Sequence, residues 1–260
     1  MKTAKKLFEE ANKLDYKNSG MEPVPELLQL GFFPGGNGII KDDEAIDPSN
    51  SIEGKEIMIV GNNFGTVCYY CKCFPKKQED ILKNPTWRNL LKLLKDSGIK
   101  KESCFFTNAY MGLIDEYYLI KREIKSGIKY DNKGNVGACP GSKKHEFVKQ
   151  CQDFFCIQLD FLPKLKLVIV LGKQAPILLM EIFPDLNWKG TFKEIDIDGN
   201  QIITTAFPST NNKIVFTIIT HPSDTRNQKL RKYKNRVGEK FEEKKVEVEI
   251  LKEAMRIAGL

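Results

Sequence analysis

The sequence predicts an α/β fold, namely a three-layer α/β/α sandwich around a central, mainly parallel four-stranded sheet. Short apolar runs alternate along the chain with segments of helical periodicity, which is typical of β-α-β units. The run 165–171, LKLVIVL, is almost entirely apolar, as expected for a parallel strand that is buried on both faces. The 260 residues are 41% hydrophobic, which is enough for one large domain with a sizeable core.

The first 50 residues are predicted to form a covering segment. Residues 3–15 have the apolar spacing of a short amphipathic helix. The stretch 20–50 is rich in Pro, Gly and Asp, which predicts an irregular segment with one short helix at 26–30. We expect the segment 1–50 and the α/β part, 51–260, to form a single domain.

Strands and helices alternate after this segment. The four strands of the sheet are predicted at 56–60, 103–108, 165–171 and 214–220, and helices at 87–97, 145–161, 173–182 and 239–258. Gly98 stands where a helix stop belongs. A turn formed by Asp-Gly-Asn at 198–200 predicts a hairpin between 192–198 and 201–205.

Polar residues follow the predicted strands at the points where they end. The first strand ends in Gly-Asn-Asn-Phe-Gly (61–65), the second in Asn108, the third in Gly172 and the last in His221-Pro222-Ser223. A single Asn after a strand is usually a turn residue, and a single His is usually structural. Ligands of parallel sheets bind beyond the carboxyl ends of the strands, so together these residues predict one binding pocket.

Four stretches carry a resemblance to a known family. They are IMIVGNNFGT (57–66), FFTNAYMGL (105–113), LVIVLG (167–172) and THPSDTRN (220–227). In this order and spacing they resemble the motifs of the uracil-DNA glycosylase superfamily over residues 55–235. The resemblance is nearest to the mismatch-specific and single-strand-selective branches that carry Asn in the first motif. Phe64 stands where the family usually has proline.

The resemblance implies a monofunctional DNA glycosylase that removes uracil or a related damaged pyrimidine and leaves an abasic site. Asn63 matches the residue that orients the attacking water, and His221 the residue that donates a hydrogen bond to O2 of the leaving base. Asn108 matches the residue that reads the pyrimidine edge. Its amide offers one donor and one acceptor, which complement O4 and N3–H of uracil. No lysine lies within the matched motifs, so we expect no lyase step.

Other residues of the matched motifs are expected to contact the flipped nucleotide. Gly65 matches a position where strict uracil enzymes carry a Tyr that blocks the thymine methyl group, which implies tolerance of some 5-substituted uracils. Phe74 is expected to stack on the base, with Tyr69 and Tyr70 as alternatives. The predicted substrate-binding set is Gly61, Asn62, Gly65, Phe74, Asn108 and Ser223, although Asn62 by itself is typical of a turn.

The stretch after His221, DTRNQKLRKYKNR (224–236), holds six basic residues and one acidic residue. Together with a net charge of +7 and a pI near 8.9, it favours a polyanionic partner. A solvated, charged loop is the alternative. We expect Leu230 or Tyr233 to fill the space left by the flipped base. The predicted DNA contacts are Arg226, Asn227, Lys229, Leu230, Arg231 and Lys232.

Seven cysteines are present, and three of them form C-x-x-C-x-C at 68–73. This spacing can begin a metal or iron–sulfur site, but no second C-x-x-C pair follows, and no cysteine precedes Cys68. Buried or half-exposed thiols are therefore the expectation, with no metal. The segment 61–66 is not a phosphate-binding loop, and we expect no cofactor.

The N-terminus is charged and lacks the apolar stretch of a signal peptide, and no apolar run reaches 18 residues. These features predict a cytosolic (cytoplasmic) protein without membrane contact, and we expect a monomer. Two alternatives to a glycosylase stay open. One is a nucleic-acid-binding protein of the same fold without turnover, because the only polar candidate for water activation is an amide. The other is a different α/β enzyme that acts on nucleotides or other phosphate esters.

Overall fold

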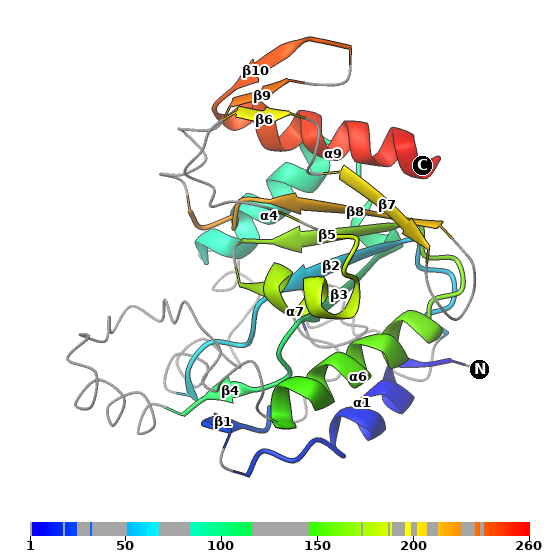
Figure 1. Cartoon of the computed structure of the whole chain (residues 1–260), viewed down its shortest axis with the longest axis vertical. Coiled ribbons are helices and arrows are strands. Elements are labelled where there is room, and N and C mark those ends of the chain that lie inside the picture. Colours follow the sequence, from blue (N-terminus) through cyan, green and yellow to red (C-terminus); the bar gives the residue numbers. More distant parts are fainter. Residues whose placement is uncertain are drawn as a thin grey trace, which may run out of the picture.

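The protein is described here by a computed structural model. It describes residues 2–17, 19–24, 32, 51–67, 84–115, 146–172, 174–186, 188, 196–198, 202–206, 213–224, 232–234 and 237–260. Within these residues the fold is a mixed α/β structure with a mostly parallel five-stranded sheet and five α-helices (Figure 1). None of the helices in the described part of the chain has the length and apolar character needed to span a membrane.

The central sheet has the strand order β3-β2-β5-β8-β7. Its strands are β3 (Cys104–Asn108), β2 (Ile57–Gly61), β5 (Leu167–Leu171), β8 (Lys213–Ile219) and β7 (Ile202–Ala206). The first four are mutually parallel, as predicted. The prediction of four strands is corrected to five, because β7 pairs with β8 in antiparallel orientation and extends the sheet.

The predicted hairpin at 192–205 is wrong. β6 (Asp196–Asp198) pairs in parallel with β9 (Lys232–Lys234), which pairs in antiparallel orientation with β10 (Lys240–Glu242) to form a separate three-stranded sheet. A local turn signal indicates a change of chain direction but not the strand with which each side pairs. β7 instead places Ile202 opposite Thr217 of β8 and buries it in the core.

Two layers of helices cover the sheet (Figure 1). α6 (Glu146–Asp160) and α7 (Ala175–Ile182) pack on one face, and α4 (Pro85–Asp96) and α9 (Lys244–Ala258) pack on the other. The predicted C-terminal helix starts later than expected, at Lys244, because residues 240–242 form β10.

β2 and β5 are buried on both faces, which explains their continuous apolar sequences. In β2, Met58 and Val60 belong to the core on the α6–α7 side, and Ile57 and Ile59 belong to the core on the α4–α9 side. Successive side chains of a strand point to opposite faces, so an apolar residue is needed at every position.

The predicted bounds of helix α4 were nearly right, because residues at both of its ends favour the start and the stop of a helix. The Asn84 side chain accepts a hydrogen bond from the backbone N–H of Thr86 at 2.9 Å, and Pro85 begins the helix. The helix ends before Gly98, whose φ of 77° lies in the left-handed region that a glycine tolerates. The predicted helix stop at Gly98 is confirmed.

The N-terminal segment packs on the core and on the loop after β3. Helix α1 (Ala4–Ala11) buries Leu7 in the same core as α6, and β1 (Met21–Glu22) pairs with β4 (Leu113–Ile114). The Tyr16 hydroxyl donates a hydrogen bond of 2.6 Å to the backbone oxygen of Met111. The predicted short helix at 26–30 lies outside the described residues.

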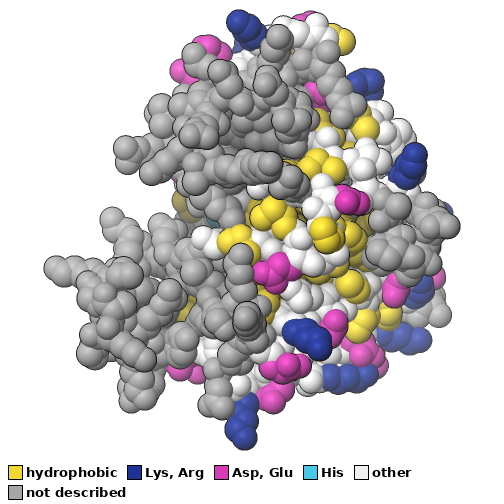
Figure 2. Space-filling model, in the orientation of Figure 1, with side chains coloured by type: hydrophobic (Ala, Val, Ile, Leu, Met, Phe, Trp, Pro, Cys, Tyr) yellow, Lys and Arg dark blue, Asp and Glu magenta, His cyan; other side chains and the backbone are white. Residues whose placement is uncertain are grey.

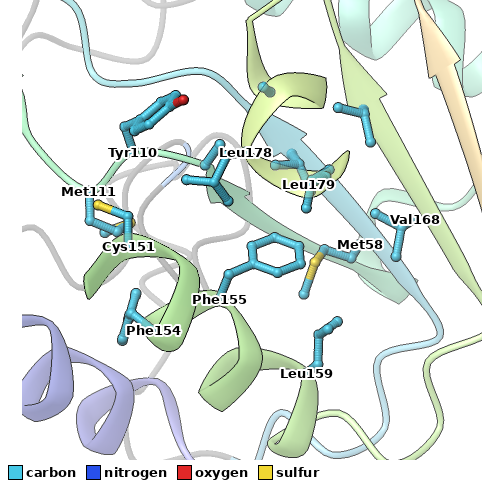
Figure 3. Close-up of a cluster of buried hydrophobic side chains, with 14 of the residues drawn as sticks. Met58, Tyr110, Met111, Cys151, Phe154, Phe155, Leu159, Val168, Leu178 and Leu179 are labelled. Carbon is cyan, nitrogen blue, oxygen red and sulfur yellow. The ribbon is translucent and has the colours of Figure 1, made fainter. Parts of the chain in front are cut away.

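The core between α6 and the sheet is rich in aromatic side chains. The Phe155 ring of α6 has no exposed surface and points toward Met58 of β2 (Figure 3). Leu159 of the same helix and Leu179 of α7 belong to this cluster. Because each of these side chains is removed from water, the cluster holds α6 and α7 against the sheet.

Candidate functional site

The carboxyl ends of β2, β3, β5 and β8 meet at one edge of the sheet, and we call the last residues of these strands and the residues that follow them the strand-end edge. The register pairs Gly61 with Asn108 across β2 and β3, and Leu171 with Ile219 across β5 and β8. Neighbouring strands lie about 4.8 Å apart, so the backbones of β3 and β8, with two strands between them, are about 14 Å apart. The structure thus brings Asn63, Asn108 and His221 to the same edge.

Gly61 leaves the space into which the Asn108 side chain extends. A Cβ atom at Gly61 would lie 2.2 Å from Oδ1 of Asn108, which is far closer than two such atoms can approach. Asn108 itself is only 2% exposed. Its Nδ2 is buried and has no hydrogen-bond partner among the described residues. The glycine at the end of β2 is therefore required by the amide on the neighbouring strand.

Asn63 forms a local turn after β2. Its Oδ1 accepts a hydrogen bond of 3.0 Å from the backbone N–H of Gly65, whose φ is 82°. Because an N–H donates to it, the atom in this bond is the oxygen of the amide and not its nitrogen. The amide nitrogen, Nδ2, is buried and has no partner in the described part of the chain. The same holds for Oδ1 of Asn62. Buried polar atoms without partners are rare in proteins and often indicate a bound water or ligand.

Backbone hydrogen bonds fix this turn to the loop after β3. The N–H of Tyr110 donates to the oxygen of Asn62 at 2.8 Å, and the N–H of Ile114 donates to the oxygen of Gly65 at 2.8 Å. Phe64 also donates its N–H, to Gly112, at 3.4 Å. A proline at position 64 has no N–H and is unable to form this bond. Phe64 therefore makes a connection between the two loops that a proline at this position would lack.

Gly172 lies next to His221, although with less tight packing than Gly61 has against Asn108. A Cβ atom at Gly172 would lie 3.2 Å from the Cβ of His221, and Gly172 has a φ of 77°. Its N–H donates a hydrogen bond of 2.9 Å to the backbone oxygen of Ile219. Both the left-handed backbone and the short distance require glycine at this position.

Contacts with Ser223 determine the tautomer of His221. The backbone N–H of Ser223 donates to Nδ1 of His221 at 3.3 Å, and the Ser223 hydroxyl lies 2.7 Å from the same nitrogen. A backbone N–H is only a donor, so Nδ1 accepts and the proton of the neutral ring is on Nε2. Burial lowers the pKa of His221 below its ordinary value, and the nearby Asp224 carboxylate opposes this shift. The imidazole is therefore neutral near pH 7.

Stability between about pH 7 and pH 5 is expected to fall less in a His221→Asn variant than in the wild type. In the unfolded chain the pKa of the imidazole is about 6.5, and in the folded protein it is lower. As the pH falls through this interval, the unfolded state binds a proton that the folded state lacks, so the free energy of unfolding decreases. Urea unfolding of both proteins across this range measures the difference. Parallel curves for the two proteins would contradict the lowered pKa.

The remaining predicted site residues are only partly described. Ser223 is exposed beside His221, and Lys232 begins β9, so part of the basic stretch after His221 forms a strand. Phe74, Arg226, Asn227, Lys229, Leu230 and Arg231 lie outside the described residues, as do Tyr69 and Tyr70. On the face drawn in Figure 2, basic and acidic side chains of the described residues are interspersed. The described part of that face therefore has no patch of one sign.

Cysteine side chains in the described residues are free thiols. Cys104 and Cys151 are buried and Cys156 is half-buried, which confirms the prediction for these three. Burial raises the pKa of the Cys104 and Cys151 thiols to about 12, so both stay protonated and unreactive. No group of three or more potential metal ligands comes together in the described part of the chain. The C-x-x-C-x-C stretch at 68–73 lies outside it.

A scan of the chain against protein-family models finds no match, and a search among curated proteins finds none either. The side chains at the strand-end edge are therefore the observation on which a function is proposed. Two amides and a neutral imidazole offer hydrogen-bond donors and acceptors to a ligand. They are able to orient a water molecule and to stabilise an anion, but an amide is not a base.

Proposed function

We propose that the protein is a DNA glycosylase that hydrolyses the N-glycosidic bond of uracil or a related damaged pyrimidine in DNA and leaves an abasic site. One observation carries this proposal. Asn63, Asn108 and His221, which match the functional positions of the uracil-DNA glycosylase superfamily, lie on one edge of the sheet, and both amides have a buried Nδ2 without a partner among the described residues. DNA is the proposed partner, and the protein is proposed to act as a monomer in the cytoplasm.

The reaction separates charge, and the strand-end edge offers groups suited to that charge. The bond between C1′ and N1 breaks, its electron pair stays on the base, and water adds to C1′ and loses a proton to solvent. His221 carries its proton on Nε2 and donates it in a hydrogen bond to O2 of the anionic base. Asn108 binds O4 and N3–H through its amide. This set of donors stabilises the leaving base without a metal or a cofactor.

Asn63 is proposed to orient the attacking water. Its Oδ1 already accepts a hydrogen bond from Gly65, but an amide oxygen has two lone pairs, and the second is available to a water molecule. The bond to Gly65 also holds the amide in one orientation. Gly65 has no side chain to exclude a substituent at C5, so 5-hydroxymethyluracil is proposed as a substrate beside uracil.

The same hydrogen bond favours a second candidate function. Because Oδ1 of Asn63 already accepts one hydrogen bond, from Gly65, while Nδ2 has no partner among the described residues, the amide has more capacity left as a donor than as an acceptor for water. A protein with this arrangement would bind a flipped pyrimidine without hydrolysing its bond. The second candidate is thus a non-catalytic nucleic-acid-binding protein of the same fold.

A cleavage assay tests the two candidates. The protein is incubated with a labelled oligonucleotide that carries one uracil or 5-hydroxymethyluracil, single-stranded or opposite G or A, in EDTA, and abasic sites are cleaved with alkali. We expect cleavage by the wild type and losses of about 100-fold or more in Asn63→Ala and His221→Ala, because each removes one preorganised hydrogen-bonding group. The matched control is Asn12→Ala, which removes an exposed amide at the end of α1. We expect this variant to retain activity.

The other outcomes of this assay separate the alternatives. Binding of uracil-DNA by the wild type without cleavage rejects the glycosylase and supports the binding protein. Neither cleavage nor binding rejects both candidates. Cleavage that survives in both Asn63→Ala and His221→Ala places the chemistry elsewhere in the chain.

A further inference from the structure

We infer that Asn89 and Glu247 are positioning residues that hold the backbone on both sides of His221 and so fix its imidazole for the reaction. This inference rests on the proposed function. Neither residue belongs to a stretch that resembles a glycosylase motif. Each reaches the backbone of a residue next to His221 from a different helix, Asn89 from α4 and Glu247 from α9.

Asn89 holds the residue that follows His221. Its Nδ2 donates a hydrogen bond of 2.8 Å to the backbone oxygen of Pro222, although the two residues are 133 positions apart in the chain. Pro222 has a restricted φ, so holding its oxygen fixes the direction in which the chain leaves His221. The N–H of Asp224 closes a turn by donating to the oxygen of His221 at 2.8 Å.

Glu247 holds the residue that precedes His221. Both of its carboxylate oxygens lie 3.4 Å from the backbone nitrogen of Thr220, and the side chain is only 2% exposed. Burying a carboxylate is unfavourable unless it is hydrogen-bonded. The neighbouring buried positions of α9, such as Val246 and Ile250, are apolar. Glu247 and Glu253 are buried carboxylates of this helix, and the contact with Thr220 supplies Glu247 with an N–H donor.

The two contacts act on the same short segment from the same side of the sheet. Helices α4 and α9 both pack on the face opposite to α6 and α7 (Figure 1). Thr220 and Pro222 flank His221 directly, and the close approach of Gly172 limits the ring from the neighbouring strand. A donor held in one place before the reaction stabilises developing charge better than a donor that has to be reoriented. We call the contacts of Asn89 with Pro222 and of Glu247 with Thr220 the clamp. The clamp therefore contributes to turnover and not to substrate affinity.

Substitutions at both positions test this inference. Asn89→Ala removes the bond to Pro222, and Glu247→Leu removes the acceptor for Thr220 while keeping the volume. Glu247→Gln keeps an oxygen at the end of the side chain and serves as the rescue variant. Lys92→Ala on α4 and Lys252→Ala on α9 are matched controls, because these lysines form exposed ion pairs on the same helices. Urea unfolding establishes that each variant is folded under the assay conditions.

We expect kcat on uracil-DNA to fall about 10- to 100-fold in Asn89→Ala and Glu247→Leu, with KM little changed. Glu247→Gln and both lysine variants keep the wild-type kcat. Imidazole ¹⁵N spectra provide an independent readout, because the chain has only 2 histidines and His145→Gln assigns the signal of His221. In the wild type, Nδ1 gives the signal of an acceptor nitrogen. In Asn89→Ala and Glu247→Leu, the two tautomers become mixed.

The two readouts distinguish failure of the inference from failure of the proposed function. If the wild type does not cleave uracil-DNA, the function is rejected, and unchanged imidazole spectra in the variants would also reject the clamp. If the wild type cleaves, the clamp is overturned by unchanged kcat in both variants. It is also overturned if kcat falls while the ¹⁵N spectrum of His221 stays unchanged, or if this spectrum changes while kcat keeps its wild-type value.

Discussion

Replacing Gly61 with alanine is expected to reduce the proposed glycosylase activity by about 100-fold or more, since a displacement of about 1 Å at a reacting centre has an effect of this size. The new Cβ would lie 2.2 Å from Oδ1 of Asn108, so the amide has to leave its position. Asn108 is 2% exposed, so this movement displaces a buried side chain. The measurement is kcat/KM on uracil-DNA, together with urea unfolding.

Gly54→Ala is the matched control for this substitution. A Cβ atom at Gly54 meets nothing within 4 Å, so the change is expected to leave activity intact. If Gly61→Ala is folded and as active as Gly54→Ala, the Asn108 amide is not required at its present position. Its proposed role in reading the pyrimidine edge would then be rejected, while the roles of Asn63 and His221 would still stand.

Replacing Phe155 with alanine is expected to lower the free energy of unfolding by about 3–5 kcal/mol. The ring has no exposed surface and lies in the core that joins α6 to the sheet (Figure 3). Its removal loses the burial of the aromatic ring and leaves a cavity. Because proteins are stable by only about 5–15 kcal/mol in total, this is a large fraction of the stability. Urea unfolding followed by circular dichroism measures it.

Val237→Ala is the control for Phe155→Ala, because Val237 is 81% exposed. A surface change of this kind is expected to alter the free energy of unfolding by less than about 0.5 kcal/mol. A loss below about 1 kcal/mol in Phe155→Ala, well under the range for a buried aromatic, would contradict the packing of α6 on the sheet.

The parallel part of the fold was predictable because β2 and β5 are continuous apolar runs and β3 and β8 are largely apolar. Such a run identifies a strand buried on both faces whatever its neighbours are. The pairing of β7 was not predictable in the same way, because it depends on β8 and not on the turn next to it. The short strands β9 and β10 are three residues each and mostly charged, so they show no apolar alternation from which to recognise them.

The place of the candidate site was predictable from a general rule, and its internal contacts were not. Asn63, Asn108 and His221 follow parallel strands, so the rule that ligands bind at the carboxyl ends pointed to their edge. Their roles remain predictions. The fit of Asn108 beside Gly61 is a contact between two strands, and sequence spacing does not reveal it. The position of Glu247 was recognisable in the sequence, because a carboxylate there interrupts the apolar face of helix α9.

The parallel pairing of β2 with β5 has a consequence for the time course of folding. Glu56 and Lys166, whose ion pair lies at the start of these two strands, are 110 positions apart in the chain. Contacts between such distant positions form slowly, because a long loop has to close before they stabilise anything. Helices α4 and α6 are local structures that form much faster. We therefore expect the strand-end edge, which needs four strands in register, to assemble later than these two helices.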